Sequence, residues 1–434
     1  MKVTEPGGTR WKRFTLDGLG RLTKVTEPNP AGGADVETSY SYNVLDKLTQ
    51  VSMTRGGVTQ LRTFVYNSDG QLTSVTQPET GTTSYTFDSY GRPWTKTDAK
   101  GNVETYTYDS HWRRYGIYRK PAGWSQNDPG QTTMVAWDTA VNGWGRVASV
   151  TNGGSLVESY EYTVGGLVTK KRLGFADYDT PLEAVYSWNQ AGQMTSMKYP
   201  DVYNADGTVA ATGRTLNYQY SYLGPPSTMS DPALPAGSQT VASGVWNGAG
   251  QMTQLSVRKP DATMDVENFT FNERGQLVQQ SGRGVNIEYR YSATANDGRL
   301  VSRKDNVSGE EVVYQYDLLG RLTSAETTGT GGWGLSWTFD GFGNRLTQGV
   351  TKGTAPVVNL TVDGATNRIS STGFVFDANG NQTQWPVGAG TASAAYDVQN
   401  RMTSVTTANG TEFYGYSSAN QRILIFRASG TETL

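Results

Sequence analysis

The chain has 434 residues, among them 52 Gly, 25 Tyr and 11 Trp, while only 36% of the residues are hydrophobic. The absence of Cys excludes disulfides and thiolate chemistry. A net charge of −2 gives no electrostatic reason to expect nucleic acid as a partner. No run of about 18 apolar residues is present, so we expect no membrane insertion by this chain.

Many glycines and aromatic residues favour short strands and tight turns over long amphipathic helices. The clearest example is YQYDLLGRLTSA, residues Tyr314 to Ala325. Its aromatic pair shares one face of an extended strand. Asp317 is then predicted to cap a turn, Gly320 to take the positive φ of a type I turn with a bulge, and Arg321 to begin the returning strand. The unit is a predicted β-hairpin.

Copies of this hairpin recur along the whole chain. The first is FTLDGLGRLTKV, Phe14 to Val25. Later copies place their turn residues at 43, 67, 88 and 109, a spacing of about 21 to 24 that indicates a repeat architecture. Two Pro-rich stretches, Arg119 to Gly130 and Gly224 to Gly244, are predicted to be long surface loops.

The last hundred residues carry denser copies, in which Asn-Arg follows or replaces the glycine. Asp363 and Asp377 lie close together in sequence, which predicts shorter strands there. We therefore expect one repeat array over 1–434, with typical hairpins over about 10–338, denser repeats over 339–426, and no separate catalytic domain.

Roughly 17 such hairpins would make about 30 to 35 strands, and open twisted sheets rarely exceed about 10 strands without curling or splitting. Repeats of about 22 residues are too short for the four-stranded blades of a propeller, which need about 40. The predicted fold is therefore all-β, with one long antiparallel sheet that spirals into a hollow shell or barrel.

The tandem YDxxGRL units, best seen in Tyr316 to Leu322 and Phe87 to Arg92, resemble the Rhs/YD-repeat family. This family includes bacterial Rhs-type polymorphic toxins, Tc-toxin shell components and teneurin-like proteins. Partial copies cover about residues 10–426, and residues 339–426 resemble the segment that precedes an Rhs core.

The resemblance implies a β-shell of a bacterial protein that is secreted or displayed at the cell surface as part of a longer parent. Its implied partner is an enclosed C-terminal toxin domain outside this chain, or another shell-forming segment of the parent. The toxin branch also cleaves itself at a motif built on Asp-Pro pairs. Here the pairs Asp128-Pro129 and Asp231-Pro232 lack the surrounding signature, so we expect no self-cleavage.

The candidate site residues are those of the repeat turns, and we interpret them as structural because the same residue types recur at the same turn. Further turn carboxylates stand at Asp109, Asp138 and Asp363. No D-x-D-x-D-G loop is present, so we expect no metal and no cofactor. The turn residues are Asp17, Gly20, Arg21, Asp88, Gly91, Arg92, Asp317, Gly320, Arg321, Asp340, Gly343, Asp377, Gly380, Asp397 and Arg401.

The only histidine, His111, is accompanied by no Ser or carboxylate motif such as G-x-S-x-G, and no phosphate loop is visible, so we expect no enzyme. An alternative function is a surface adhesion or carbohydrate-binding module, in which tryptophans stack on sugar faces. The same tryptophans could instead cover the seams between strands. They are Trp94, Trp112, Trp124, Trp144, Trp333 and Trp385.

Overall fold

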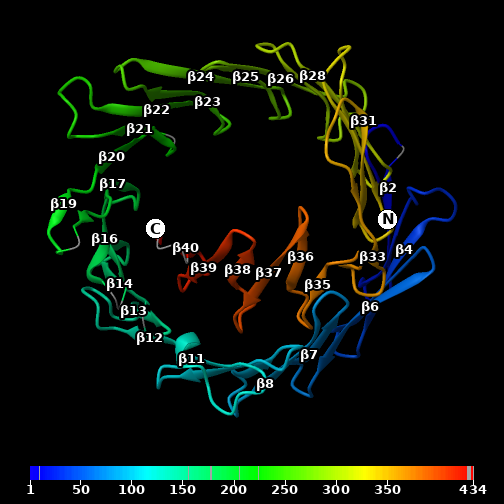
Figure 1. The fold of residues 1–434 in the computed structure, drawn as a ribbon, viewed down its shortest axis with the longest axis horizontal. Helices are drawn as coiled ribbons and strands as arrows, with labels where there is room; N and C mark the ends of the chain where they lie inside the picture. The colour runs from blue at the N-terminus through cyan, green and yellow to red at the C-terminus, as the bar shows by residue number, and fades with distance from the viewer. Residues whose placement is uncertain are drawn as a thin grey trace. The chain divides into compact units, whose positions relative to one another are not determined.

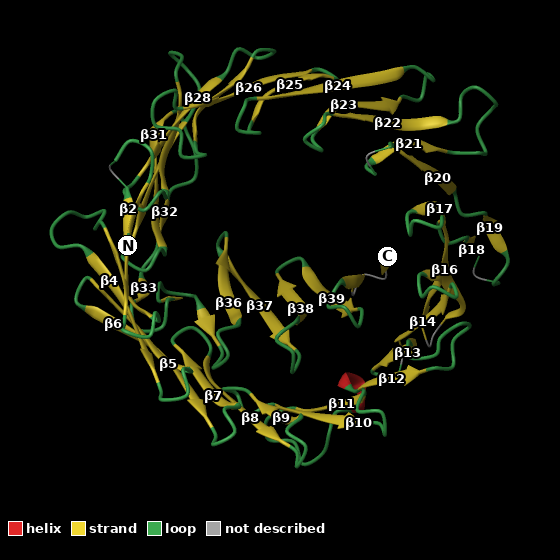
Figure 2. Cartoon of the chain, turned by 180° about the vertical axis from the view of Figure 1, so that it is seen from behind, coloured by secondary structure: helices red, strands yellow, loops and turns green. Residues whose placement is uncertain are grey.

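The structure is a computed structural model, and it describes residues 1–8, 10–154, 156–175, 178–204, 206–222, 224–427 and 432–433. The described residues form 41 strands and one short 3-10 helix, η1 (Pro129–Gln131), with no α-helix (Figure 1). Figure 2 shows this composition as yellow strands and green loops with a single red turn. The predicted all-β class is confirmed. Within the described ranges, no helix has the length and apolar character needed to span a membrane.

The strands are short, and most have five to nine residues. The first are β1 (Lys2–Thr4), β2 (Trp11–Leu16), β3 (Leu22–Glu27), β4 (Val36–Tyr42), β5 (Leu48–Arg55), β6 (Val58–Tyr66), β7 (Leu72–Gln77), β8 (Gly81–Phe87), β9 (Pro93–Thr97), β10 (Val103–Tyr108), β11 (Arg114–Lys120), β12 (Thr133–Trp137), β13 (Val147–Asn152) and β14 (Leu156–Tyr162). Next come β15 (Val168–Phe175), β16 (Tyr178–Trp188), β17 (Met194–Lys198), β18 (Val202–Tyr203), β19 (Val209–Ala211), β20 (Thr215–Tyr220), β21 (Pro226–Ser230), β22 (Thr240–Trp246), β23 (Met252–Arg258), β24 (Met264–Phe271), β25 (Leu277–Gly282), β26 (Val285–Tyr291), β27 (Leu300–Asp305) and β28 (Glu311–Tyr316). The last are β29 (Leu322–Thr327), β30 (Gly334–Phe339), β31 (Arg345–Lys352), β32 (Val358–Asn359), β33 (Val362–Asp363), β34 (Arg368–Ile369), β35 (Val375–Phe376), β36 (Gln382–Val387), β37 (Gly390–Tyr396), β38 (Met402–Thr407), β39 (Gly410–Tyr416), β40 (Arg422–Arg427) and β41 (Glu432–Thr433).

Thirty of the described strands belong to one sheet, and seven more, β35 to β41, form a second. Strands pair antiparallel with their neighbours in the sequence, as β2 does with β3, β3 with β4, and β4 with β5. Strand β17 pairs with β20 because β18 and β19 form a small hairpin of their own. The predicted long antiparallel sheet, built from successive hairpins, is confirmed.

Two kinds of turn alternate along the meander. The pairing of β4 with β5 crosses a five-residue turn, and its register shifts at Tyr42, which marks a β-bulge. The pairing of β5 with β6 crosses a two-residue Gly56-Gly57 turn between Arg55 and Val58. Short turns of this kind hold neighbouring strands in one register.

Side chains alternate between two different faces of the strands. On β28, Val312 is only 2% exposed and shares its face with the half-buried Tyr314 and Tyr316, while Val313 is 39% exposed on the other face. Tyr314 lies opposite Ala325, which is 3% exposed. The apolar core is therefore a thin layer in which aromatic rings cover small residues of the next strand.

One Pro-rich stretch differs from its predicted structure. Residues Gly224 to Gly244 do not form one long loop, because β21 and the first part of β22 lie within them and the loop between these strands is only residues 231–239. Pro226 is the first residue of β21, where a missing N–H group is tolerated. The prediction gave the prolines more weight than the Thr, Ser and Val residues that form these strands.

The chain divides into two compact units. Unit 1 comprises Met1–Ser84 and Glu267–Gln382, and unit 2 comprises Tyr85–Val266 and Thr383–Leu434. Each unit thus combines an early segment of the chain with a late one. In unit 1, the four consecutive strands β32 to β35 have two residues each, as expected for the closely spaced turns between Asp363 and Asp377.

Candidate functional site

The turn that begins at Asp317 has a dense set of hydrogen bonds. The carboxylate Oδ1 of Asp317 accepts from the backbone N–H of Leu319 and of Arg321, both at 2.9 Å. Its Oδ2 accepts from Nε of Arg321 at 2.6 Å. Gly320 has φ of 79° and donates its N–H to the carbonyl of Asp317. One carboxylate therefore orders the whole turn, since it binds two backbone amides and a guanidinium.

The same geometry recurs at the other turns of this type, which we call repeat turns. Each runs from the capping residue to the fifth residue, as 317–321 does. The carboxylate also accepts from Nε of a fifth-residue arginine in the pairs Asp17–Arg21, Asp88–Arg92, Asp109–Arg113 and Asp397–Arg401. In Asp340–Asn344 and Asp377–Asn381, it accepts from Nδ2 of an asparagine.

A second version of the repeat turn uses amides alone. Asn247 caps its turn through Oδ1, and its Nδ2 donates to Oε1 of Gln251 at 2.9 Å. The same contact joins Asn67 to Gln71, Asn189 to Gln193 and Asn272 to Gln276. The type of the first residue is thus matched to that of the fifth. The Asn–Gln pairing is visible in the sequence, but the predicted hairpin did not include it.

The fourth residue of the repeat turn has positive φ throughout. Gly20, Gly91, Gly343 and Gly380 have φ of 81°, 78°, 99° and 84°. In the turn that begins at Asp109 this place is taken by Trp112, with φ of 67°. L-residues other than Asn and Asp rarely adopt this conformation, so Trp112 carries a local strain that the glycines avoid. Asn400 takes the same place with φ of 61°.

The arginine of one repeat also contacts the next. Arg113 donates through both Nη atoms to the carboxylate of Asp138, at 2.9 and 2.7 Å. This hydrogen bonding from Arg113, together with a backbone bond from Gly145, lowers the pKa of Asp138 to about 2. Similar contacts run from Arg21 to Asp46, from Arg321 to the carbonyl of Asp340, and from Arg401 to Asn420.

The aromatic residue before each turn completes this contact. Arg21 lies over the ring of Tyr42, at 5.1 Å from its centroid, and the Tyr42 hydroxyl donates to the carbonyl of Leu22 at 2.9 Å. Arginines also lie over Tyr108, Trp137, Phe339 and Tyr416. A tyrosine hydroxyl or tryptophan N–H reaches the preceding repeat from Tyr108, Tyr162, Trp188, Tyr220, Trp246 and Tyr416. Neighbouring hairpins are therefore joined by a cation–π contact, a polar bond or both.

Within unit 1, late turns contact early segments of the chain. Gln60 on β6 is 1% exposed, and its Nε2 donates to the carbonyl of Gly364 and to Oδ1 of Asn367, both at 2.7 Å. Arg10 donates to the carbonyl of Asp317. The contacting residues are 304 to 307 positions apart in sequence.

Four charged side chains strengthen the contact at the start of the chain. Arg299 bonds Glu5 at 2.9 Å and Asp297 at 2.8 Å, and Arg10 also pairs with both acids. The hydrogen bond from Arg299, only partly offset by burial, lowers the pKa of Glu5.

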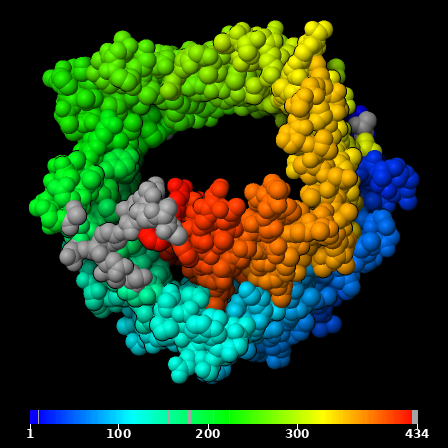
Figure 3. Space-filling view, in the orientation of Figure 1, coloured from blue at the N-terminus to red at the C-terminus, as the bar shows by residue number. Residues whose placement is uncertain are grey.

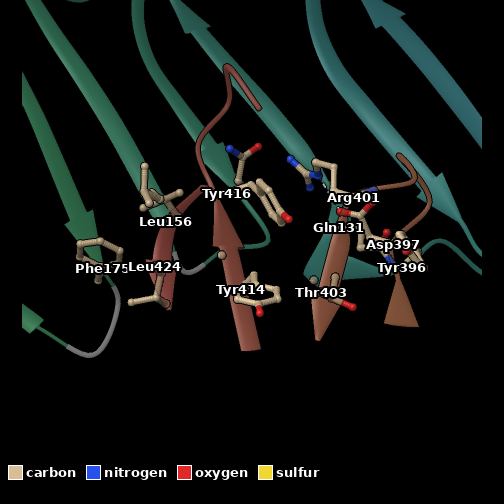
Figure 4. A pocket seen from close by; sticks show the side chains of 14 residues that line it. Gln131, Leu156, Phe175, Tyr396, Asp397, Arg401, Thr403, Tyr414, Tyr416 and Leu424 are labelled. Carbon is tan, nitrogen blue, oxygen red and sulfur yellow. Dashed lines mark hydrogen bonds and ion pairs between the residues drawn. The ribbon is translucent and has the colours of Figure 1, made fainter. Parts of the chain in front are cut away.

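Unit 2 contains equivalent contacts between segments 260 and 267 positions apart, at Ser418 with Glu158 and at Val398 with Gln131. Figure 3 shows the red atoms of the late strands directly against blue-green ones. A pocket of about 330 Å³ lies beside these contacts, and Figure 4 shows Leu156, Tyr416 and Leu424 lining it.

Among the described residues, the predicted turn residues contact one another only within one repeat or between two neighbouring repeats. In the part of the chain that the structure describes, no three His, Asp or Glu residues group closely enough to hold a metal ion. The two Asp-Pro aspartates cap local structure: Asp128 accepts from Gly130 N–H, and Asp231, 5% exposed, accepts from Ala233 N–H and Arg214.

The single histidine lies in the repeat turn capped by Asp109, whose Oδ1 accepts from the backbone N–H of His111 at 2.9 Å. His111 is exposed, and its ring nitrogen is 3.4 Å from the Ser110 hydroxyl. Trp94, Trp112, Trp124 and Trp144 are 53%, 58%, 55% and 82% exposed. Trp333 and Trp385 are half-buried, and the former donates to Glu310.

The fold and these turns define a class of protein: an antiparallel β-repeat protein whose hairpins are closed by Asp-capped or Asn-capped turns. Residues 66–103 and 296–332 match the family model described as RHS Repeat. These two segments carry the repeat that characterises Rhs/YD-repeat proteins, and the chain resembles that family.

The chain is similar to a probable deoxyribonuclease RhsB of Dickeya dadantii (strain 3937), with 26% identity over 252 residues. It is similar in fold to a chain of the TcdB2–TccC3 crystal structure, with a TM-score of 0.79, 15% identity and 98% of this chain covered. The Photorhabdus luminescens Tc holotoxin pore gives a TM-score of 0.78, 15% identity and 96% coverage. This chain spans only 16% of the RhsB protein and 24% and 23% of the two structural relatives.

Proposed function

We propose that this chain is a non-catalytic β-shell scaffold of an exported Rhs/YD-repeat protein. The scaffold encloses or presents a C-terminal toxin domain that lies outside this chain, in a longer parent that is secreted or displayed at the bacterial cell surface. The observation that carries this proposal is the fold shared over 98% of the chain with a chain of the TcdB2–TccC3 structure.

The contacts between distant segments support a sheet that returns upon itself. In unit 1 and, separately, in unit 2, late turns contact segments that lie 260 to 307 positions earlier. The side chains that make these contacts are buried, including Gln60 and Glu158, each 1% exposed. Where a late segment of the sheet packs against an early one, the buried polar groups need hydrogen-bond partners, because unpaired polar groups would destabilise the contact.

The non-catalytic part of the proposal rests on how the carboxylates are used. Asp17, Asp88 and Asp317 each bind two backbone amides and one arginine of their own turn. A carboxylate engaged in this way is a poor general base, because the ionised form is already stabilised by its donors. We propose one repeat array over residues 1–434, without a separate catalytic domain.

Limited proteolysis of the longer parent tests the enclosure. The domain that follows residue 434 is expected to be digested at least about tenfold more slowly in the parent than alone, because a protease cannot reach an enclosed chain. Equal digestion rates would contradict enclosure. A parent unfolded in denaturant serves as the control for intrinsic cleavage sites.

A second candidate function is adhesion through carbohydrate binding, and the four exposed tryptophans favour it. Trp144, at 82% exposed, has the most accessible ring of the four. Glycan-array screening of the native chain and of Trp144→Ala would test it, with the half-buried Trp385→Ala as the matched control. We expect the Trp144 variant to lose glycan binding and the Trp385 variant to keep it. An array without hits would contradict this function.

A further inference from the structure

Two side chains in unit 2 hold the late strands β37 to β40 against earlier ones. The N–H of Val398 donates to Oε1 of Gln131 at 2.8 Å, and the N–H of Ser418 donates to Oε1 of Glu158 at 2.7 Å. Both donors are the second residue of a repeat turn, whose N–H points away from the turn. The two anchors thus have the same geometry, but one acceptor is ionisable and the other is a neutral amide.

The groups around Glu158 are donors and a cation, which favour the negatively charged form of its carboxylate. The side chain is 1% exposed, and its Oε2 accepts from the Tyr160 hydroxyl at 3.0 Å and lies 3.2 Å from Nζ of Lys171. Tyr160 on β14 and Lys171 on β15 are the titratable groups that face it, and the adjoining Ser417 is 2% exposed. Hydrogen bonds to a buried ionised carboxylate are roughly twice as strong as bonds between neutral groups.

The second anchor has no such charge dependence. Gln131 accepts through its amide oxygen, while its Nε2 donates to Asp128 at 2.8 Å. Val398 is 4% exposed, and Gln131 is half-buried. The Gln131 contact is therefore an internal reference for the Glu158 contact.

We propose that Glu158 is a charge-dependent latch: its ionised carboxylate holds the repeat turn 417–421 on β14, and its neutralisation releases this turn while the Gln131 anchor stays closed. Release would open the pocket of about 330 Å³ on the side of Tyr416 and Leu424. The late strands then separate from β14 at the Ser418 end, while the Val398 end stays anchored to Gln131.

The expected pH dependence follows from the donors around the carboxylate. Burial alone would raise the pKa of Glu158, but the bonds from Ser418 and the charge of Lys171 outweigh it and bring the pKa below the ordinary 4.5. A carboxyl whose pKa is lowered on docking stabilises the docked state above pH 4.5, and that contribution is lost as the pH falls through the lowered value. The latch therefore opens below pH 4.5.

Hydrogen exchange of the full chain, followed by mass spectrometry and corrected for intrinsic rates, tests the latch. As the pH is lowered from 7 through the range below 4.5, protection of peptides that contain the Ser418 amide is expected to fall at least about tenfold once the carboxyl is protonated, and that of Val398 peptides less than about threefold. A parallel fall at both anchors would overturn the proposal, because it would indicate general acid unfolding.

Two variants sharpen this test. Glu158→Gln is expected to lower Ser418 protection at pH 7 and to remove its pH dependence. Gln131→Glu is expected to make Val398 protection pH-dependent, because it places an ionisable acceptor at the reference anchor. Unchanged Ser418 protection in Glu158→Gln would overturn the latch. Should that variant fail to fold, a Gln131→Glu chain without new pH dependence at Val398 would overturn it.

Discussion

In the Asp–Arg, Asp–Asn and Asn–Gln repeat turns the first and fifth residues contact each other, and their chemical types are matched. A carboxylate faces an arginine or asparagine donor, as in Asp317 with Arg321, and an amide faces a glutamine, as in Asn247 with Gln251. The match places one donor against one acceptor in each of these pairs. An Asn opposite an Arg would instead place two donors together.

A double-mutant cycle at Asp317 and Arg321 tests this matching. Asp317→Asn alone keeps the Oδ1 acceptor but turns Nδ2 toward the guanidinium, and we expect it to lower stability by about 1 kcal/mol. Arg321→Gln should cost more, because Arg321 also bonds Asp340 and covers Phe339. The double variant recreates the Asn–Gln pair and should recover most of the loss from Asp317→Asn. Purely additive effects in urea unfolding would contradict the match.

The turn glycines offer a matched pair of substitutions. Gly20 and Gly320 have nearly equal φ, at 81° and 79°, but a Cβ at Gly20 would meet open space, whereas one at Gly320 would meet the guanidinium of Arg299. Gly20→Ala should cost about 1 kcal/mol, which is the cost of the left-handed conformation alone. Gly320→Ala should cost more. Equal losses in the unfolding free energy would show that the Arg299 guanidinium moves aside without cost.

At the scale of the hairpin, the stabilising contacts join two neighbouring repeats. Arg21, Tyr42 and Leu22 illustrate it: the guanidinium covers the ring, and the hydroxyl bonds the carbonyl. Phe339, under Arg321, shows that a repeat also forms without the hydroxyl. The ring therefore contributes independently of the polar bond.

Substitutions at Tyr42 separate the two contributions. Tyr42→Phe keeps the ring under Arg21 and should cost about 0.5 to 1.5 kcal/mol, the value of one hydrogen bond. Tyr42→Leu loses the ring as well and should cost clearly more. Hydrogen exchange across β3 and β4 is the measurement, with β12 and β13 of unit 2 as the unaffected control. A larger effect from Phe than from Leu would contradict this account.

The sequence predicted the hairpin itself because its signals are local. An aromatic pair, an Asp cap and a Gly at the fourth place are encoded within about ten residues, as in Tyr314 to Ala325. The cross-repeat contacts of Arg113 and Tyr42 were not predicted, because they depend on strand register and on how far one hairpin turns from the next. The strands β21 and β22 were missed because Pro residues masked an ordinary strand composition.

At the scale of the whole chain, buried polar residues such as Gln60 and Glu158 become intelligible only from contacts 260 to 307 positions away. Nothing near Glu158 in the sequence distinguishes it from the exposed acids of other strands. The resemblance to Rhs/YD-repeat proteins supplied the expectation of a shell, and the shared fold with the TcdB2–TccC3 chain supports it.

Small-angle X-ray scattering of the purified chain tests the proposed shell most directly. A solid globule of 434 residues has a radius of gyration of roughly 22 Å. A wall around an open interior places its mass farther from the centre, so the proposal predicts a clearly larger value and a pair-distance distribution whose maximum is shifted to long distances. A radius of gyration near that of the solid globule, with a symmetric distribution, would contradict the shell.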